Sequence, residues 1–334
     1  MKKLLVLLLA GILAIIPTGG CAQKEKTSIG MAVEFNAHSA CAYISQDKGW
    51  YEQEGLNLRA YESYATGMAL ASALARGDIE VAYICLVPAI NIYANAGVPI
   101  KIIAGTHKYG YGLVVNPEKI QTVNDLEKPG IRLGCIQVGG AVDVLMHKMI
   151  DKYNLDQGKI LANVQRMDPS KQVLAIKMGQ LDAAFLPEQW ATMAEELGFK
   201  MLLMSQDIWP EMQGSVLVVK EDLIDNHPEV VKKLVDVSQK ATDWANKHPE
   251  EAAEVIARQL QAAGGKIPSD APEGMSKLEI TPELLLKSMS RLEYTTEIDP
   301  AEVQATIDYI AALGYIKSSF NAADILDLRF LEGE

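Results

Sequence analysis

The sequence predicts an α/β protein with two similar domains, and three observations carry this prediction. The chain has 334 residues, whereas a single hydrophobic core stops growing at roughly 250–300 residues. The segment ALARGDIEVAYI at 73–84 recurs as AIKMGQLDAAFL at 175–186, which is 102 residues later. In both copies an apolar helical pattern ends at a glycine, and a short apolar strand starts after an acidic residue. The stretch 33–62 has the pattern of a strand, a polar turn, an amphipathic helix and a second strand, which is the start of an α/β sheet.

Composition and charge exclude one class of partner. Hydrophobic residues make up 49% and charged residues 22% of the chain, as in ordinary globular proteins. The net charge is −12, and an acidic chain with scattered lysines does not attract nucleic acid. We therefore expect no nucleic-acid partner.

The N-terminus predicts export. Two lysines precede the apolar run 4–16, and small residues then lead to Cys21, which is the pattern of a signal peptide over residues 1–20. The two glycines and the cysteine resemble a bacterial lipoprotein cleavage box, although Thr18 stands where that box usually has leucine. The resemblance implies that Cys21 is lipidated and that residues 21–27 form a tether. The alternative is an ordinary secretory signal whose removal also removes Cys21.

The rest of the sequence has no second membrane signal. No other apolar run reaches the roughly 18 residues that a membrane-spanning helix needs. We therefore expect an extracytoplasmic protein. A lipid anchor would hold it to a bacterial membrane, on the periplasmic side or on the outer face of the cell.

The remaining elements follow from apolar periodicity and from glycine and proline positions. The helix after the first strand carries one apolar stripe from Ala40 to Tyr51 and stops at Gly55. Glycines among aromatic residues at 105–112 are typical of a crossover that must flex. The expected strands are 57–62, 100–104, 113–115, 131–135, 163–167 and 214–219, and the expected helices begin at 89 and 142 and at the prolines 228, 249, 282 and 300.

The run QDKGWYEQEGL at 46–56 resembles the xxKGYFxxEGL signature of bacterial solute-binding proteins of ABC transporters. It is most similar to the branch that serves nitrate, aliphatic sulfonates, taurine and thiamine-precursor pyrimidines. The resemblance implies a periplasmic-binding-protein-like fold of type II, with a ligand cleft between two α/β domains and two hinge crossovers. The first domain would be discontinuous, with residues 28–112 and 215–334, and the second would span residues 113–214.

The resemblance also implies a function. We expect a monomeric receptor, not an enzyme, that closes on a small molecule and delivers it to an ABC permease and its ATPase. It would need no cofactor and no metal. The rival is an enzyme similar to a pyrimidine synthase of related fold, whose chemistry involves a histidine and iron. Of the five histidines only His38 and His107 fall in expected cleft loops, without paired carboxylates or a metal-binding spacing. A third possibility is a sensory receptor module that works with a partner.

The expected binding site lies where strands end. Ligands of open α/β sheets bind beyond the carboxyl ends of strands, near helix N-termini, and two facing domains form a cleft there. The expected lining is therefore the set of loops that follow strands. The candidate ligand-binding residues in these loops are Asn36, His38, Ser39, Tyr64, Thr66, Cys85, Thr106, Tyr109, Gly139, Gly140, Glu188 and Trp190.

The chemistry of these loops favours an organic ligand. Tyrosine and tryptophan supply flat faces for a planar body. Lys108 is the only fixed cation in the loops, so a small anion would depend on neutral donors and helix dipoles. Glu188 would repel an anion but would pair with an amine, although its loop has Pro-Glu where the family often has Glu-Pro. We expect a planar or amine-bearing heterocycle such as a pyrimidine or thiamine precursor. The alternative is a small anion: an aliphatic sulfonate, taurine or nitrate.

Some candidates have a second, purely structural interpretation. His38 could be a surface turn residue, Thr66 a helix cap, and Trp190 a core residue. The cysteines that follow Cys21 also have more than one interpretation, because their spacings match no metal motif. We expect buried free thiols, while a thiol near the ligand and a disulfide both stay open. These cysteines are Cys41, Cys85 and Cys135.

Overall fold

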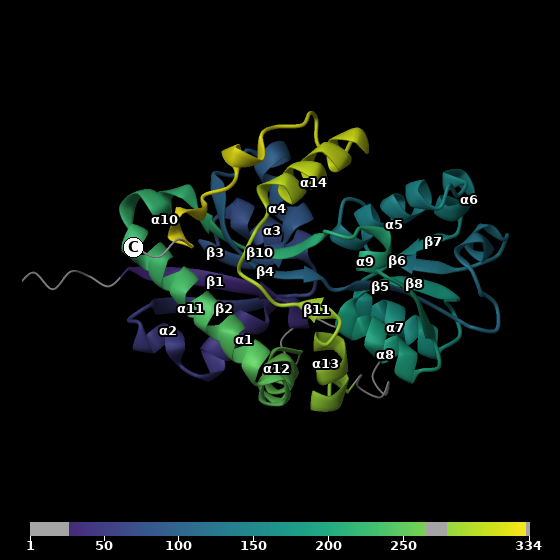
Figure 1. The fold of residues 1–334 in the computed structure, drawn as a ribbon, viewed down its shortest axis with the longest axis horizontal. Helices are drawn as coiled ribbons and strands as arrows, with labels where there is room; N and C mark the ends of the chain where they lie inside the picture. The colour runs from purple at the N-terminus through teal and green to yellow at the C-terminus, as the bar shows by residue number, and fades with distance from the viewer. Residues whose placement is uncertain (1–26, 265–278, 332–334) are drawn as a thin grey trace, which may run out of the picture.

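The computed structural model describes residues 27–264 and 279–331 (Figure 1). The expected signal peptide, the expected lipidation site Cys21 and all of the expected tether except Thr27 lie outside these residues. Within the described part of the chain, no helix is both long and apolar enough to cross a bilayer. The chain forms two β-sheets, and helices pack around each of them (Figure 1).

The first sheet has six strands in the order β11-β4-β10-β3-β1-β2. The strands β1, β2 and β3 run parallel, and β10 runs antiparallel to both β3 and β4. The bounds are β1 Ser28–Glu34, β2 Asn57–Tyr64, β3 Val81–Cys85, β4 Ile100–Tyr109, β10 Gln213–Lys220 and β11 Leu292–Glu293.

The second sheet repeats the pattern of the first, with five strands in the order β7-β6-β8-β5-β9. The strands β6, β7 and β8 run parallel, and β5 runs antiparallel to β8 and β9. The strand β8 thus has one parallel and one antiparallel neighbour, as β3 has in the first sheet. The bounds are β5 Tyr111–Val115, β6 Leu133–Cys135, β7 Val164–Arg166, β8 Ala183–Pro187 and β9 Lys200–Met204.

The sequence repeat corresponds to the same unit in both sheets. Helix α3 precedes β3 and helix α7 precedes β8. Gly77 and Gly179, which follow these helices, have φ of +83° and +66°, a conformation that glycine adopts at little cost. The two units occupy equivalent places in two sheets, so the prediction of two α/β units is confirmed.

The chain crosses between the sheets twice. The first crossing joins β4 to β5 through Tyr109 and Gly110, both with positive φ (64° and 84°). The second joins β9 to β10 through the short helix α9. The expected domain limits lie after residues 112 and 214. These are the second residues of β5 and β10, so both limits fall just inside the strand that follows a crossing. We call the first sheet with its helices the first lobe, and the second sheet with its helices the second lobe.

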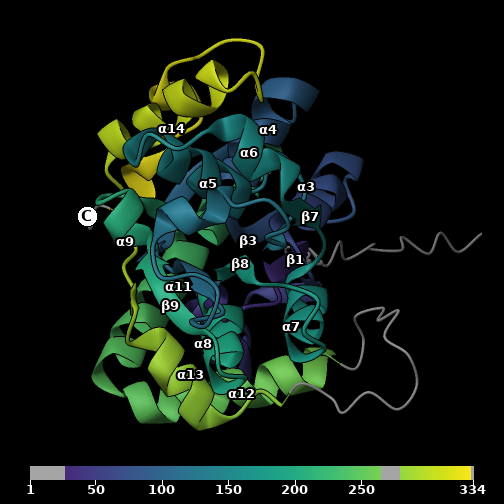
Figure 2. The same cartoon turned by 90° about the vertical axis from the view of Figure 1, so that its right-hand side faces the viewer.

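Helices cover both lobes, and four of them begin at the prolines that the sequence marked. Helix α1 packs against α11 and α12, which return to the first lobe after the second crossing. In Figure 2 helix α13 lies beside α8 of the second lobe, in agreement with their contacts. The α-helices are α1 Ala40–Asp47, α2 Trp50–Gln53, α3 Gly67–Arg76, α4 Leu86–Ala96, α5 Ala141–Lys152, α6 Gln157–Ala162, α7 Pro169–Lys177, α8 Glu188–Glu196, α9 Ser205–Ile208, α10 Glu221–Asn226, α11 Pro228–Lys247, α12 Pro249–Gly264, α13 Pro282–Met289 and α14 Pro300–Ala312. The 3-10 helices are η1 Ala37–Ser39, η2 Val123–Glu127, η3 Ala322–Asp324 and η4 Leu328–Phe330.

Three expectations about local structure are wrong. The helix expected up to Tyr51 breaks into α1 and α2, because Gly49 adopts φ +67°. The strand β4 continues through the expected flexible segment as far as Tyr109, since the antiparallel β10 pairs with it. The loops expected after β3 and β8 are absent, because each strand leads directly into a helix, at Leu86 and at Glu188.

An acidic residue ties the repeated turn to the neighbouring strand in both lobes. Asp182 is buried and accepts hydrogen bonds from Arg132 Nε (2.9 Å), Arg132 Nη2 (2.8 Å) and Lys119 Nζ (2.6 Å). The hydrogen bonds that Asp182 accepts from Arg132 hold the pKa of this carboxyl well below its usual range. Glu80, at the equivalent position of the first lobe, accepts from Gly30 N and from Arg59.

Asp182→Asn is expected to lower the free energy of unfolding by about 1–2 kcal/mol, because two cations lose their charged acceptor. The measurement is urea denaturation at neutral pH. Since the folded pKa of Asp182 lies below its unfolded value, the contribution is complete above about pH 4 and declines as the pH falls below it. Glu80→Gln is the matched control and should cost less, because its ion pair with Arg59 is more exposed. Equal losses in both variants would contradict this account.

Candidate functional site

A narrow cleft lies between the two lobes, at the carboxyl ends of the parallel strands. Its lining comes from both lobes, and the remaining space is about 20 Å³, which holds about one water molecule. A larger solute can therefore enter only if the lobes separate. The first lobe contributes Glu34, Asn36, Ala65, Thr66, Gly67, Met68, Cys85 and Pro88, and the second contributes Tyr111, Ile136, Gly140, Ala141, Val142, Pro169, Pro187 and Trp190.

Glu34 is the one acidic side chain in this lining. It ends β1, is 3% exposed, and accepts hydrogen bonds from Cys85 N (2.6 Å), Cys85 Sγ (3.1 Å) and Asn36 Nδ2 (3.1 Å). Burial raises its pKa, although these three donors act in the opposite direction. Gly67 permits this placement, because a Cβ there would lie 2.3 Å from Glu34 Oε1. A carboxyl group is thus held at the cleft floor, and none of the described residues that line the cleft is a Lys or an Arg.

Cys85 joins Glu34 to the second lobe. Its Sγ lies 2.9 Å from Tyr111 Oη and 3.6 Å from Ser215 Oγ. The thiol is buried and lines the cleft, and burial raises its pKa well above its usual value. The three cysteines in the described part of the chain are all free, so the disulfide alternative is wrong. Cys85 lines the cleft, and the alternative of a thiol near the ligand stays a prediction.

Two histidine rings lie in contact, tilted by 38°, beside the first crossing. The rings of His38 and His107 lie 4.2 Å apart between centroids. His38 is 1% exposed, so its interpretation as a surface turn residue is wrong. Its Nε2 donates to the carbonyl of Gly110 at 2.7 Å, because a carbonyl can only accept. Burial lowers the pKa of His38 to about 4, and the ring is therefore neutral at neutral pH. Glu34, His38 and Cys85 together bring carboxylate, imidazole and thiol donors within 4.8 Å of one another, and these are the described residues that could hold a metal.

Direct hydrogen bonds join the lobes around the cleft. Gln189 Oε1, on α8, accepts from Ala37 N at 2.6 Å, and its Nε2 donates to Phe35 O at 3.4 Å. Asn91 Nδ2, on α4, donates to Gly139 O at 2.9 Å. The turn after β1 is therefore bonded to the helix that follows β8.

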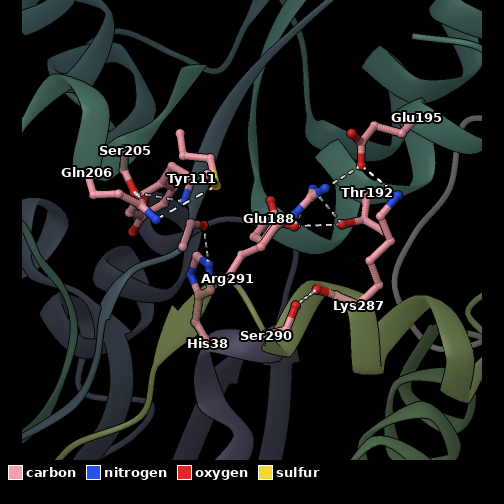
Figure 3. A network of polar contacts seen from close by, with 12 residues as sticks. His38, Tyr111, Glu188, Thr192, Glu195, Ser205, Gln206, Lys287, Ser290 and Arg291 are labelled. Carbon is pink, nitrogen blue, oxygen red and sulfur yellow. Dashed lines mark hydrogen bonds and ion pairs between the residues drawn. The ribbon is translucent and has the colours of Figure 1, made fainter. Parts of the chain in front are cut away.

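An ion-pair network links the second lobe to the C-terminal segment of the first (Figure 3). Arg291 Nη1 lies 3.1 Å from Glu188 Oε1, and Arg291 Nη2 lies 2.8 Å from Glu195 Oε2. Lys287 Nζ lies 2.8 Å from the same Glu195 oxygen, and Thr192 Oγ1 donates to Glu188 Oε1 at 2.6 Å. Arg291 directly precedes β11, which pairs with the crossing residue Tyr109. The network therefore bridges α8 and the segment 287–291. Its five side chains are Glu188, Thr192, Glu195, Lys287 and Arg291.

Burial raises the pKa of Glu188 to about 7, against the hydrogen bond from Thr192 and the charge of Arg291. When the lobes separate, water reaches Glu188 and its pKa returns toward its ordinary value of 4.5. The closed form then binds more protons than the open form between about pH 4.5 and pH 7. Lowering the pH through this window should therefore favour closure, and raising it should favour opening. Small-angle scattering across pH 5–8 measures this, and Glu188→Gln should flatten the profile. A profile that stays steep in this variant would assign the effect to another group.

The structure brings some of the predicted ligand-binding residues to the cleft and leaves others outside its lining. The five that line the space are Asn36, Thr66, Cys85, Gly140 and Trp190. The seven that do not line it are His38, Ser39, Tyr64, Thr106, Tyr109, Gly139 and Glu188. Contact of any of these residues with a ligand stays a prediction.

Two of the side chains outside the lining have polar partners elsewhere. Tyr64 Oη donates to Glu62 at 2.7 Å, and Glu188 pairs with Arg291. Thr66 combines two roles, since it lines the cleft and its Oγ1 accepts from Ala69 N at the start of α3. The interpretation of Thr66 as a helix cap is thus confirmed.

Sequence reasoning missed three residues that shape the site: Glu34, Gln189 and Arg291. A signal existed for Glu34, because an acidic residue closes an otherwise apolar strand. Gln189 lies beside the chosen Glu188, and the sequence does not show which of the two faces the other lobe. Arg291 lies about a hundred residues from its partners, so no local pattern could reveal it.

Comparison with known sequences matches most of the chain to one family. The model of the NMT1-like family matches residues 22–260. A binding protein of Brucella abortus (strain 2308) is 25% identical over 294 residues, which cover 86% of this chain and 87% of that protein. The taurine-binding periplasmic protein of Escherichia coli (strain K12) is 22% identical over 215 residues, which cover 62% and 64%.

Comparison with solved structures shows the fold. A ligand-binding component of an ABC-type import system from Staphylococcus aureus, solved with zinc bound, has a TM-score of 0.74 at 17% identity and covers 91% of this chain and 97% of its own. The alkanesulfonate-binding protein of Xanthomonas axonopodis pv. citri, bound to MOPS, has a TM-score of 0.73 at 15% identity, with coverage of 90% and 98%. The nitrate-binding protein of Synechocystis PCC 6803 has a TM-score of 0.73 at 15% identity, with coverage of 92% and 88%. The predicted periplasmic-binding-protein-like fold is thereby confirmed.

Proposed function

The chain belongs to the NMT1-like family, and from this premise we propose that it is the extracytoplasmic solute-binding component of an ABC import system. Its two domains, residues 28–112 with 215–334 and residues 113–214, close on a small organic molecule and deliver it unchanged to a permease and its ATPase. A lipid at Cys21 holds the monomer to the membrane. The names of its relatives as binding proteins, together with a cleft lined from both lobes, support this role.

The solute we propose is a planar or amine-bearing heterocycle, such as a pyrimidine or thiamine precursor. The observation that carries this proposal is the buried carboxyl of Glu34 at the cleft floor, among lining residues that include no Lys and no Arg in the described part of the chain. A buried carboxylate needs N–H donors or a cation, and an aminopyrimidine or an amine supplies them. Trp190 and Tyr111 contribute aromatic side chains to the lining from the second lobe.

An anion is the second candidate, because relatives are named for taurine, alkanesulfonate and nitrate. The N-termini of α3 and α5 reach the cleft at Gly67 and Ala141. Backbone N–H groups at helix N-termini attract anions. The two candidates differ in the sign of their interaction with the Glu34 carboxylate, which would repel a bare anion and attract an amine.

A thermal-shift screen tests both candidates. The form that lacks residues 1–21 loses none of the described elements and would be screened against pyrimidine and vitamin precursors, amines, amino acids, sulfonates and nitrate. A ligand at a hundred times its Kd stabilises the folded state by about 2.7 kcal/mol. A hit among the heterocycles or amines supports the proposal, whereas a hit confined to sulfonates or nitrate selects the alternative. A solute that is consumed during prolonged incubation would instead indicate an enzyme.

Trp190→Ala is expected to weaken binding of a planar solute about two- to tenfold, because an aromatic contact contributes about 0.5–1.5 kcal/mol beyond its buried area. Trp190 is 5% exposed and lies 6.1 Å from Phe35 between ring centroids. Calorimetric titration measures the affinity, and Trp190→Phe should retain most of it. A variant that loses stability but keeps full affinity would make Trp190 a core residue only.

A further inference from the structure

Three donor groups of different chemistry meet at the cleft floor, and the proposed function uses only one of them. Glu34 ends β1, Cys85 ends β3, and His38 lies in the turn η1 that follows β1. The strands β1 and β3 are adjacent and parallel, so their carboxyl ends reach the same edge of the sheet. A carboxylate oxygen, an imidazole nitrogen and a thiol sulfur all lie within 4.8 Å of one another.

These donor types are the ones that zinc takes in proteins. Zinc bonds of about 2.0–2.3 Å place tetrahedral donors about 3.3–3.8 Å apart. The distance from Glu34 Oε2 to Cys85 Sγ is 3.1 Å, which is close to this range without any rearrangement. A His38 ring nitrogen lies within 4.8 Å of the other two donor atoms, so the ring would have to move closer to them to complete a three-donor set.

His38 supplies an independent observation. Its Nε2 donates to the Gly110 carbonyl, and its buried Nδ1 has no hydrogen-bond partner in the described part of the chain. The ring is therefore neutral with a bare lone pair on one nitrogen. A ring that donates through one nitrogen to a backbone carbonyl and is bare at the other has the tautomer of a metal ligand. An unpartnered buried nitrogen costs free energy, and coordination would remove that cost.

The acidic groups in the cleft lining also favour a divalent cation. Glu34 and Cys85 both line the cleft, and no Lys or Arg is among its described lining residues. Burial raises the pKa of both groups, and a bound divalent ion would act in the opposite direction by favouring their ionised forms. One divalent ion would balance the two negative charges that result.

We propose that Glu34, His38 and Cys85 bind a divalent transition-metal ion of the zinc class, with the remaining coordination position open to the cleft. On binding, the thiol proton of Cys85 and any proton on Glu34 leave to solvent, and His38 coordinates as the neutral ring. The ion would lie at the floor of the cleft that takes the solute. The proposal shares Glu34 with the proposed solute contact, so a bound ion and an amine-bearing solute would compete for the same carboxyl.

The test titrates Co²⁺ into the full chain, solubilised in detergent and freed of metal under reducing conditions. A cobalt–thiolate bond produces a charge-transfer band in the near ultraviolet, which His or carboxylate ligation alone does not produce. One equivalent should produce the band, and Zn²⁺ should displace Co²⁺ and abolish it. Absence of the band, or a band that forms only in large excess of metal, would overturn the proposal.

Matched cysteine variants assign the band. Cys85→Ser should lose it, while Cys41→Ser and Cys135→Ser should keep it, because these two thiols are equally buried but lie outside the donor cluster. A band that survives in Cys85→Ser overturns the assignment. If Cys85→Ser fails to fold by circular dichroism, His38→Gln decides, since it should weaken Co²⁺ affinity at least tenfold. Unchanged affinity in His38→Gln would also overturn the proposal.

The metal titration contains no organic solute, and the solute screen contains no added metal. Failure of the titration therefore leaves the proposed import function intact. Failure of the screen leaves the metal result intact. The two proposals can be judged separately.

Discussion

Glu34→Gln is expected to weaken binding of an amine-bearing or N–H-rich solute on the order of a hundredfold, or about 2–3 kcal/mol, because a charged acceptor becomes a neutral amide. Fold stability should change little. The amide keeps the shape of the carboxyl and retains one oxygen that can accept the hydrogen bond from Cys85 N. Calorimetric titration with the solute identified by the screen gives the affinity, and urea denaturation gives the stability.

Glu62→Gln is the control for this prediction. Glu62 lies on β2, is exposed, and accepts from Tyr64, so the variant should retain full affinity. The informative opposite outcome is tighter binding by Glu34→Gln. A bare anion would show that behaviour, since removing a nearby negative charge helps it, and this result would select the sulfonate or nitrate alternative.

Arg291→Ala is expected to shift the lobes toward an open arrangement by about 2–3 kcal/mol at pH 8. At that pH Glu188 is ionised, because its pKa is about 7, and the variant leaves this carboxylate 2% exposed without its cation. This free-energy shift is at the low end of the range for buried ion pairs, because the Arg291 side chain is 20% exposed. A solute that binds the closed form would lose about 30- to 150-fold in affinity.

Small-angle scattering of the solute-free protein measures the opening, and titration measures the affinity. Lys287→Ala is the matched control, because Lys287 contacts the same Glu195 but is 48% exposed, and exposed pairs contribute about 0–1 kcal/mol. At pH 5, where Glu188 is protonated, the effect of Arg291→Ala should shrink. An effect of the same size at both pH values would show that Arg291 acts through packing and not through the charge of Glu188.

Local sequence patterns were sufficient for the architecture. The repeat at 73–84 and 175–186 predicted two equivalent units, and α3-β3 and α7-β8 occupy equivalent positions in two sheets. The prolines at the starts of α11 to α14 marked those helices. These signals work because hydrophobic periodicity and glycine or proline geometry act over a few residues, where sequence distance and spatial distance agree.

The site was predicted less completely, because its residues meet across long sequence separations. Asn36, Thr66 and Trp190 follow strands and could be expected at a strand edge. The pairing of Arg291 with Glu188 depends on how the C-terminal segment returns to the first sheet beside the crossing residue Tyr109. No pattern within either segment contains that information.

The sequence alone determined the two α/β units, the approximate crossings between them and the strand edges where a ligand would lie. Only the tertiary structure decided which side chains are buried together there. Glu34, His38 and Cys85 come from two strands and a turn that the parallel pairing of β1 and β3 brings to one edge, and Glu188 faces Arg291 instead of the cleft. The physical reason is that burial, shifted pKa values and ion pairing depend on all neighbours in space, and those neighbours are set by packing between lobes that are far apart in the chain.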